Sequence, residues 1–380
     1  MKVVTFFQKF LQTEAASGVL LVFTAALALL LANSSAAPAY FNFLAYRIVL
    51  PAGLDLPVLH WINDALMAIF FLLVGLEIKR ELIQGELSSA RKAALPAAAA
   101  LGGMIFPALI FTGINWGSPA VHGWAIPTAT DIAFSLGIIS LLGNRVPLAL
   151  KVFLTALAIV DDLGAVAVIA LFYTSKLDLV SLGWAVLLTT ALIAANRRGF
   201  RKISIYLLAG LPLWYLVHHS GIHATVAGVV LAFCIPREIG EQIEKTIHPW
   251  VAYLIMPIFA LANAGVQISG GLAEAISHPV GIGVLLGLFF GKQLGITIFS
   301  WLAAKLNVAE LPAGVDFKGL YGAACLGGIG FTMSIFIATL SYEGNHLLDV
   351  AKLGILAGSL ISAFLGLLVL LLRFPRPGKS

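Results

Sequence analysis

The stretch ALAIVDDLGAVAVIALF, residues 156–172, places two adjacent acids, Asp161 and Asp162, inside an apolar run long enough to cross a membrane. At the centre of a bilayer, an ionisable side chain costs roughly 2.5–3.5 kcal/mol on insertion scales. Such residues therefore face a bundle interior or an aqueous cavity, and they commonly mark the path of an ion. The acidic pair is our first candidate for a functional site.

The composition of the whole chain is that of a membrane protein. Hydrophobic residues make up 60% of the 380 residues and charged residues only 11%, whereas a soluble domain is about 25% charged. Apolar runs of roughly 20 residues, the length that spans a bilayer, recur throughout. We predict an all-α polytopic membrane protein with about twelve transmembrane helices, near residues 16–33, 58–79, 94–114, 121–143, 149–173, 180–196, 203–218, 222–235, 247–267, 280–304, 318–340 and 350–372.

These spans form a single transmembrane domain, residues 1–380, because the longest gaps, 34–57 and 305–317, are too short to bury a core of their own. The first apolar run can also be read as a cleavable signal peptide. Its length of about 16 residues is long for that role, so we expect a retained helix.

The basic residues predict the orientation, because positively charged loops stay on the cytoplasmic side. With the N-terminus inside, most of the 23 lysines and arginines fall in inside loops, whereas Arg47, Lys176 and Lys352 fall outside. We therefore expect both termini to be cytoplasmic. The formal net charge of +5 follows from this topology, and a nucleic-acid partner is not expected.

Two further charges, Asp131 and Lys292, also lie deep within predicted spans. A buried ion pair of Asp161 with Lys292 that merely joins two helices would account for only one of three acids. The remaining negative charge favours a cation or protons. Thr128 and Thr130 add oxygen donors without a nearby cysteine or histidine, which suits sodium or lithium better than a transition metal.

The adjacent acids also suggest a transport mechanism. Successive helical residues point about 100° apart, so Asp161 and Asp162 cannot aim at one point, but they can line one cavity from two angles. Protons and a metal ion then compete for the same oxygens, which is enough for exchange transport. If both acids lose protons when one sodium ion binds, one net charge moves per cycle, and a membrane potential contributes about 2.3 kcal/mol per 100 mV.

Two spans carry signals for interrupted helices. Pro127 precedes Asp131 and predicts a break near residues 127–131. In ACLGGIGFTMSIFIATL, Gly327, Gly328 and Gly330 cluster between apolar runs. Paired interruptions point to an ion site, although glycines also permit close helix packing. An acid beside a break can neutralise the positive ends of half-helices.

The segments ALAIVDDLGAV, AIPTATDIAFSLGI, FFLLVGLEIKRELIQGEL, GIHATVAG, HPWVAYLIMPIFALANAGV and CLGGIGFTMSIFIA together resemble the NhaA family of bacterial sodium/proton antiporters, and the match covers nearly the entire chain. The NhaA family is one of the cases from which the relation between interrupted helices and ion sites is known. The relation therefore does not support the resemblance independently. The resemblance implies inverted repeats, two interrupted helices that cross at mid-membrane, and location in the bacterial inner membrane. It also implies electrogenic export of Na+ or Li+ in exchange for H+, with no cofactor, serving pH and sodium homeostasis.

The resemblance also implies roles for individual residues. Asp162 would be the principal sodium ligand, and Asp161 a proton-carrying acid that can pair with Lys292. Asp131 and Thr130 would be partners at the crossing, and Asp162, Asp161 and Thr130 would supply oxygens to Na+.

Activation at alkaline pH is a further implication of the resemblance. The matching positions are Glu77, Glu81, His223, Glu241, Glu244 and Lys245. A histidine with an ordinary pKa near 6.5 can respond in this range, and an acidic cytoplasmic mouth can attract sodium. Taken alone, a residue such as His223 is more often a satisfied polar residue than a sensor.

The first outside loop, AYRIVLPAGLDLPVL, contains two β-prone runs around a Pro-Ala-Gly turn. The resemblance implies that this loop forms a hairpin and contributes to a homodimer, with membrane lipid as the other partner. A surface loop without a partner is the simpler alternative.

Two other functions compete with antiport. An intramembrane aspartyl protease would need Asp131 and one of the later acids to share a proton, but the residues before Asp161 lack a Gly-x-Gly-Asp pattern. A sodium-coupled solute symporter would need a larger polar pocket than these spans offer.

Overall fold

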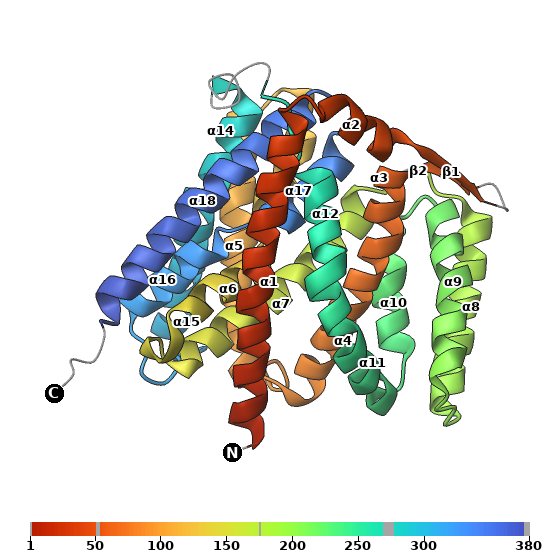
Figure 1. Cartoon of the computed structure of the whole chain (residues 1–380). Coiled ribbons are helices and arrows are strands. Elements are labelled where there is room, and N and C mark those ends of the chain that lie inside the picture. The colour runs from red at the N-terminus through yellow and green to blue at the C-terminus, as the bar shows by residue number, and fades with distance from the viewer. Residues whose placement is uncertain (1, 51–53, 175, 269–276, 376–380) are drawn as a thin grey trace.

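The computed structural model describes residues 2–50, 54–174, 176–268 and 277–375, and these residues form a helical bundle with one small hairpin (Figure 1). In chain order the elements are α1 (Lys2–Ala32), α2 (Ala37–Ala45), β1 (Arg47–Leu50), β2 (Leu54–Pro57), α3 (Val58–Trp61), the π-helical segment η1 (Ile62–Leu66), α4 (Met67–Gln84), α5 (Ala90–Ile114), the 3-10 helix η2 (Pro119–Thr128), α6 (Ile132–Leu141), the 3-10 turn η3 (Gly143–Arg145), α7 (Leu148–Phe172), α8 (Leu179–Arg197), α9 (Ile203–His219), α10 (Val226–Cys234), α11 (Arg237–Trp250), the π-helical segment η4 (Val251–Ile255), α12 (Met256–Asn263), α14 (Pro279–Leu286), the π-helical segment η5 (Gly287–Gly291), α15 (Lys292–Lys305), α16 (Phe317–Gly327), α17 (Phe331–Ser341) and α18 (Leu347–Arg373).

The predicted all-α membrane architecture is confirmed. Within the described residues, 8 helices are long and apolar enough to cross a membrane, or up to 10 if two bent pairs each count as one span. Those pairs are α1 with α2, bent by 108°, and α16 with α17, bent by 44°. The shorter helices α9 and α10 occupy the predicted spans 203–218 and 222–235, so every predicted span overlaps a helix.

Three of the long helices contain a π-helical segment that the sequence did not predict. Val58–Gln84 passes through η1, Arg237–Asn263 through η4 and Pro279–Lys305 through η5. Such segments insert an extra residue into a turn, and they are frequent at functional sites. Here η1 contains Asp64, and η5 ends immediately before Lys292.

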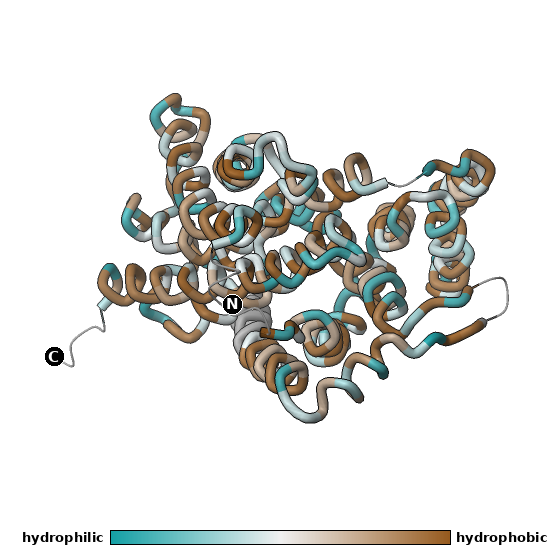
Figure 2. The backbone as a smooth tube through the Cα atoms, turned by 90° about the horizontal axis from the view of Figure 1, so that it is seen from above, coloured by the Kyte–Doolittle hydropathy of each residue, from teal (hydrophilic) through white to brown (hydrophobic). Residues whose placement is uncertain are grey.

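The bundle has two distinct ends in Figure 1. Helix α1 begins and α18 ends toward one end, which we call the terminal end, and α4 and α11 meet there. The strands β1 and β2 lie at the opposite end, which we call the hairpin end. From above, apolar residues extend over the periphery of the bundle (Figure 2). Large apolar side chains such as Leu109, Leu208 and Leu360 are exposed, as lipid-facing residues are.

The predicted hairpin is confirmed. Strands β1 and β2 are antiparallel, with Arg47 opposite Pro57 and Leu50 opposite Leu54. Arg47 Nε lies 2.9 Å from Asp55 Oδ1 across the ladder. The Pro-Ala-Gly turn, residues 51–53, lies outside the described residues, as do the basic residues Arg376 and Lys379.

Glycine sets the distance between α5 and α15. A Cβ atom added to Gly102 would lie 2.1 Å from the carbonyl oxygen of Gly295, and one added to Gly295 would lie 2.0 Å from that of Gly102. The two backbones therefore touch without intervening side chains, as small residues allow in membranes. This contact fixes α15, and with it Lys292, against the bundle.

We predict that Gly295→Ala lowers the free energy of unfolding by about 1–3 kcal/mol, because overpacking outweighs the helix propensity gained by alanine. The measurement is thermal unfolding of purified protein in detergent. The matched control is Gly113→Ala on α5, where an added Cβ meets nothing within 4 Å. Equal melting temperatures for the two variants would contradict the contact.

Candidate functional site

Two interrupted helices meet in the middle of the bundle, as the sequence predicted. The first break separates η2 from α6 at residues 129–131, and the second separates α16 from α17 at residues 328–330. The backbone N–H of Asp131 donates to the carbonyl oxygen of Ile329 at 2.6 Å, which joins the two breaks directly.

The glycines of the second break serve close packing, which was the alternative interpretation of that cluster. A Cβ atom on Gly328 would lie 2.5 Å from the carbonyl oxygen of Leu288, and one on Gly330 would lie 3.0 Å from that of Ala129. Pro127 lies inside η2, which is a 3-10 helix and not an α-helix.

Asp131 caps two helix N-termini at once. Its Oδ1 accepts a hydrogen bond from the Phe134 N–H of α6 at 3.0 Å, and its Oδ2 accepts from the Thr332 N–H of α17 at 3.0 Å and from the Thr332 hydroxyl. A carboxylate there neutralises the positive ends of both helices. Thr332 was not singled out from the sequence, because only the partner helix reveals its role.

Hydroxyl groups serve the opposite, carbonyl end of the same crossing. Thr130 Oγ1 donates to the carbonyl oxygen of Gly327 and Ser135 Oγ to that of Leu326, each at 2.8 Å. Thr128 instead donates to Ala125 in its own helix. The Thr130 hydroxyl keeps its lone pairs, so it can still accept from a donor or contact a cation.

Lys292 and Asp161 form a buried ion pair between α15 and α7. Lys292 Nζ donates to Asp161 Oδ2 at 2.7 Å, and each side chain is 1% exposed. The second oxygen, Oδ1, is buried without a hydrogen-bond partner among the described residues. The pairing expected for these two residues is therefore present.

Asp162 points elsewhere, into a cavity of about 60 Å³ that Asp131, Thr332, Glu77 and His248 also line. Asp162 is 1% exposed, and its Oδ1 has no hydrogen-bond partner among the described residues. A buried polar atom of this kind requires water or an ion, and the cavity exceeds the roughly 10–15 Å³ that one water needs. The two adjacent acids are thus divided, one to a lysine and one to the cavity.

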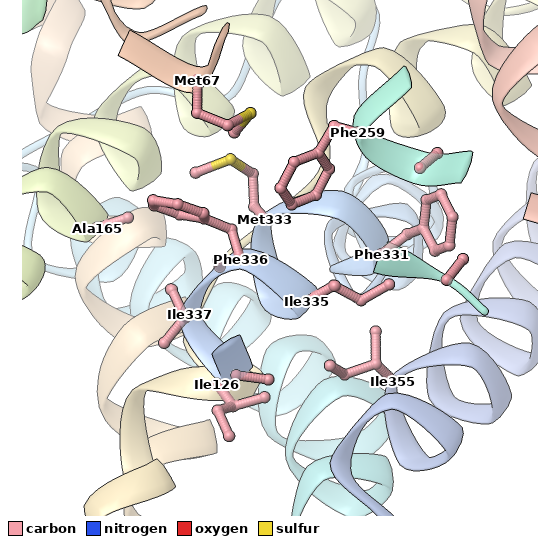
Figure 3. Packing of buried hydrophobic residues seen from close by; sticks show 14 of the residues in the cluster. Met67, Ile126, Ala165, Phe259, Phe331, Met333, Ile335, Phe336, Ile337 and Ile355 are labelled. Carbon is pink, nitrogen blue, oxygen red and sulfur yellow. The ribbon is translucent and has the colours of Figure 1, made fainter. Parts of the chain in front are cut away.

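The cavity lies on the terminal side of the crossing, because Glu77 of α4 and His248 of α11 line it. A cluster of buried apolar side chains adjoins the cavity. We call it the apolar plug and define it as Met67, Phe71, Phe259, Met333 and Phe336. Figure 3 labels all of these except Phe71. Met333 lines the cavity itself. Phe336 is fully buried, with ring centroids 5.6 Å from Phe71 and 6.2 Å from Phe259.

Most of the predicted pH-responsive residues gather where α4 meets α11. Arg80 forms ion pairs with Glu244 and, at 3.3 Å, with Glu81. Arg237 lies 3.2 Å from Glu241, and Lys245 is exposed on the same helix. Glu77 instead lines the cavity that Asp162 faces.

His223 lies apart from this group, at the hairpin end. Its Nδ1 is 2.8 Å from the Thr225 hydroxyl, and its Nε2 is 3.4 Å from Asp64 Oδ1. The structure therefore does not bring the six candidates together. Asp64 was missed because its place near a span end gave no reason to expect a buried position.

The donor set suits an alkali cation. Within the described ranges, no three histidine, cysteine, aspartate or glutamate side chains converge on a metal position. The cavity offers carboxylate and hydroxyl oxygens, the ligands of hard cations, together with one imidazole, that of His248.

Comparison with known proteins is consistent with this chemistry. The family model described as Na+/H+ antiporter 1 matches residues 8–370. The Na+/H+ antiporter NhaA of Aeromonas hydrophila is 52% identical over 97% of this chain and 96% of its own. That of Nitrobacter hamburgensis is 53% identical over 96% and 90%, and that of Shewanella frigidimarina 48% identical over 98% of both chains.

We predict that Lys292→Met destabilises the protein by up to about 3–5 kcal/mol at alkaline pH, because it leaves the Asp161 carboxylate buried without its partner. The double variant Asp161→Asn/Lys292→Met should recover most of this loss. Thermal unfolding in detergent measures both, with Lys305→Met at the exposed end of α15 as control. A double variant no more stable than Lys292→Met would contradict the pairing energy.

Proposed function

The chain belongs to the NhaA family of Na+/H+ antiporters, and from this premise we propose that it exports sodium ions in exchange for protons. The family consists of transporters, so the chain is a multi-pass membrane transporter and not an intramembrane protease. The observation that carries the proposal is the Asp162 carboxylate. It is buried, one oxygen lacks a partner among the described residues, and it faces a cavity shared with a second acid.

In the proposed mechanism, Asp162 is the principal ligand of the transported cation. Asp131 is held by Phe134 and Thr332, so it shapes the cavity and adds negative charge beside it. Thr130 contributes through the hydroxyl that anchors the crossing. Lithium, also a hard monovalent cation, would use the same oxygens.

The ion pair of Asp161 with Lys292 supplies the proton chemistry in this proposal. When a proton binds Asp161, the attraction that holds Lys292 weakens, and when sodium arrives at Asp162 that proton is driven off. Protons on both acids would exchange for one sodium ion. Each cycle would then move one net charge, and the membrane potential would contribute about 2.3 kcal/mol per 100 mV.

We place the terminal end in the cytoplasm of a bacterium and the protein in its inner membrane, because the basic residues of the short loops favour that orientation. In this orientation, the cavity lined by Asp162 receives sodium from the cytoplasm. The apolar plug separates this cavity from the outside. Alternating access requires the plug to open while the cytoplasmic mouth closes.

The charged cluster of Arg80, Glu81 and Glu244 beside that mouth is our candidate for alkaline activation, with Glu241 and Lys245 next to it. Its ion pairs join α4 to α11, and α4 also carries Glu77 in the cavity. A change of charge at the junction would therefore reach the ion site through one helix. Salt and pH homeostasis are the physiological roles that fit such a transporter.

We also propose a homodimer through the hairpin. Strand β1 presents Val49 with 73% of its surface exposed, and Ile48 is 38% exposed beside it. A two-stranded ribbon is marginal by itself, whereas pairing with a second copy extends the sheet.

We predict that Asp162→Asn abolishes sodium-driven proton movement in proteoliposomes, because the amide cannot exchange a proton and lacks the negative charge that binds the cation. A pH-sensitive dye in the lumen, read after sodium addition, measures the exchange. Asp349→Asn, an exposed acid at the start of α18, is the control that should transport normally. Normal transport by a folded Asp162→Asn protein would refute the assignment of the site.

We further predict that the exchange rate responds to an imposed membrane potential. A potassium gradient with valinomycin sets the potential, and sodium flux is followed at equal pH on both sides. Two protons per sodium ion require faster flux when the potential drives positive charge in the proton direction. A rate indifferent to the potential would instead indicate an electroneutral one-for-one exchange.

A further inference from the structure

A second cavity, of about 710 Å³, lies at the hairpin end, on the far side of the apolar plug from Asp162. It is rich in ionisable side chains that the exchange mechanism does not use. These are His60, Asp64, His122, His218, His223 and Glu343, which come from distant parts of the chain. We call it the outer cavity.

One ion pair ties the two sides of the outer cavity together. His60 Nε2 of α3 lies 2.6 Å from Glu343 Oε1, in the turn between α17 and α18. The side chains are 39% and 69% exposed, so protons from the surrounding water reach them. The hydrogen bond from His60 lowers the pKa of Glu343, so the carboxylate stays ionised and the histidine is the member of the pair that titrates.

A second contact in the outer cavity joins Asp64 to two histidines. Asp64 Oδ2 lies 3.7 Å from His218 Nδ1 of α9, and Asp64 Oδ1 lies 3.4 Å from His223 Nε2. The His223 ring in turn packs edge-on against Phe336 of the plug, with centroids 5.3 Å apart.

Both contacts converge on α17. Glu343 follows the end of this helix, Phe336 lies in its middle, and Thr332 at its start binds Asp131 of the crossing. Eleven residues of α-helix form a rod of about 16 Å. A change at the Glu343 turn is therefore carried along one short helix to the plug and to the ion site.

Protonation sets the charge of this cavity. Histidine has an ordinary pKa near 6.5. With His60 neutral, Asp64 and Glu343 leave the outer cavity negative, whereas a protonated His60 cancels part of that charge. The other groups that act on His60 are Asp64 and Arg47, and His223 feels His218 and Glu343 as well as His60.

We propose that the pair of His60 with Glu343 is a proton-sensitive latch on the outer cavity, which holds α17 and the plug closed when the outside is acidic. This inference rests on the proposed function and orientation. Below the histidine pKa the ion pair is complete. As the external pH rises through that pKa, the charge-assisted hydrogen bond weakens, α17 is released, and the two carboxylates admit a cation from outside.

The test is exchange of radioactive sodium for unlabelled sodium across right-side-out membrane vesicles, with internal pH fixed and external pH varied from 6 to 8.5. His60→Gln removes the charge at every pH and should exchange about threefold faster than wild type at pH 6 but equally at pH 8.5. His60→Arg keeps the pair charged and should exchange about threefold slower than wild type at pH 8.5.

The matched control is His219→Gln, because His219 is adjacent to His218 but exposed outside the cavity, against the Tyr215 ring. It should follow the wild-type profile. A wild-type profile in both His60 variants would overturn the latch. Absence of any sodium exchange in wild type would instead refute the proposed function, so the two failures are distinguishable.

A second measurement does not depend on transport. Thermal unfolding in detergent should separate wild type from Glu343→Gln at pH 6, where the pair is charged, and bring them together at pH 8.5. The same difference at both pH values would mean that Glu343 contributes only packing, and the latch would be wrong.

Discussion

A charge inside a bilayer must find a partner, and this requirement organises the centre of the protein. Three carboxylates share that region, and the fold treats each one differently. Asp131 receives backbone and hydroxyl donors from two helix N-termini, and Asp161 receives an ammonium group from Lys292. Of the three, only Asp162 lines the 60 Å³ cavity with an oxygen that accepts no hydrogen bond from a described residue. Asp161 also keeps one oxygen without a partner among the described residues, but of these two acids only Asp162 lines that cavity, and this is the position that our proposal assigns to the transported ion.

The broken helices follow from the same requirement. A continuous α-helix satisfies its own backbone and offers nothing to an ion, whereas an interrupted one exposes N–H groups and carbonyl oxygens at depth. Some of these groups pair across the crossing, where the Asp131 N–H donates to Ile329 and the Gly327 carbonyl accepts from the Thr130 hydroxyl. The N–H groups of Gly330 and Phe331 instead donate to Ser359 of α18. The crossing is therefore held by reciprocal hydrogen bonds, and a movement of either helix must be shared by both.

The features readable from the sequence are those encoded by local pattern. Apolar runs gave the spans, Pro127 and the glycines after residue 326 gave the breaks, and the β-prone runs gave the hairpin. Depth within a span identified the charged residues, but their partners depend on how each helix is rotated. The role of Thr332, the separation of His223 from Glu244 and the contact of His60 with Glu343 all join residues far apart in the chain. The π-helical segments were also invisible, because one inserted residue barely changes an apolar pattern.

The 3-10 form of η2 has a geometric consequence of its own. A 3-10 helix rises about 2.0 Å per residue and an α-helix about 1.5 Å. The ten residues of η2 are therefore about 5 Å longer than the same residues would be in an α-helix. This surplus lies directly beside Asp131. If η2 were rewound as an α-helix, it would shorten and move the Asp131 carboxylate along the axis of η2. No strand would have to unpair and no loop would have to extend.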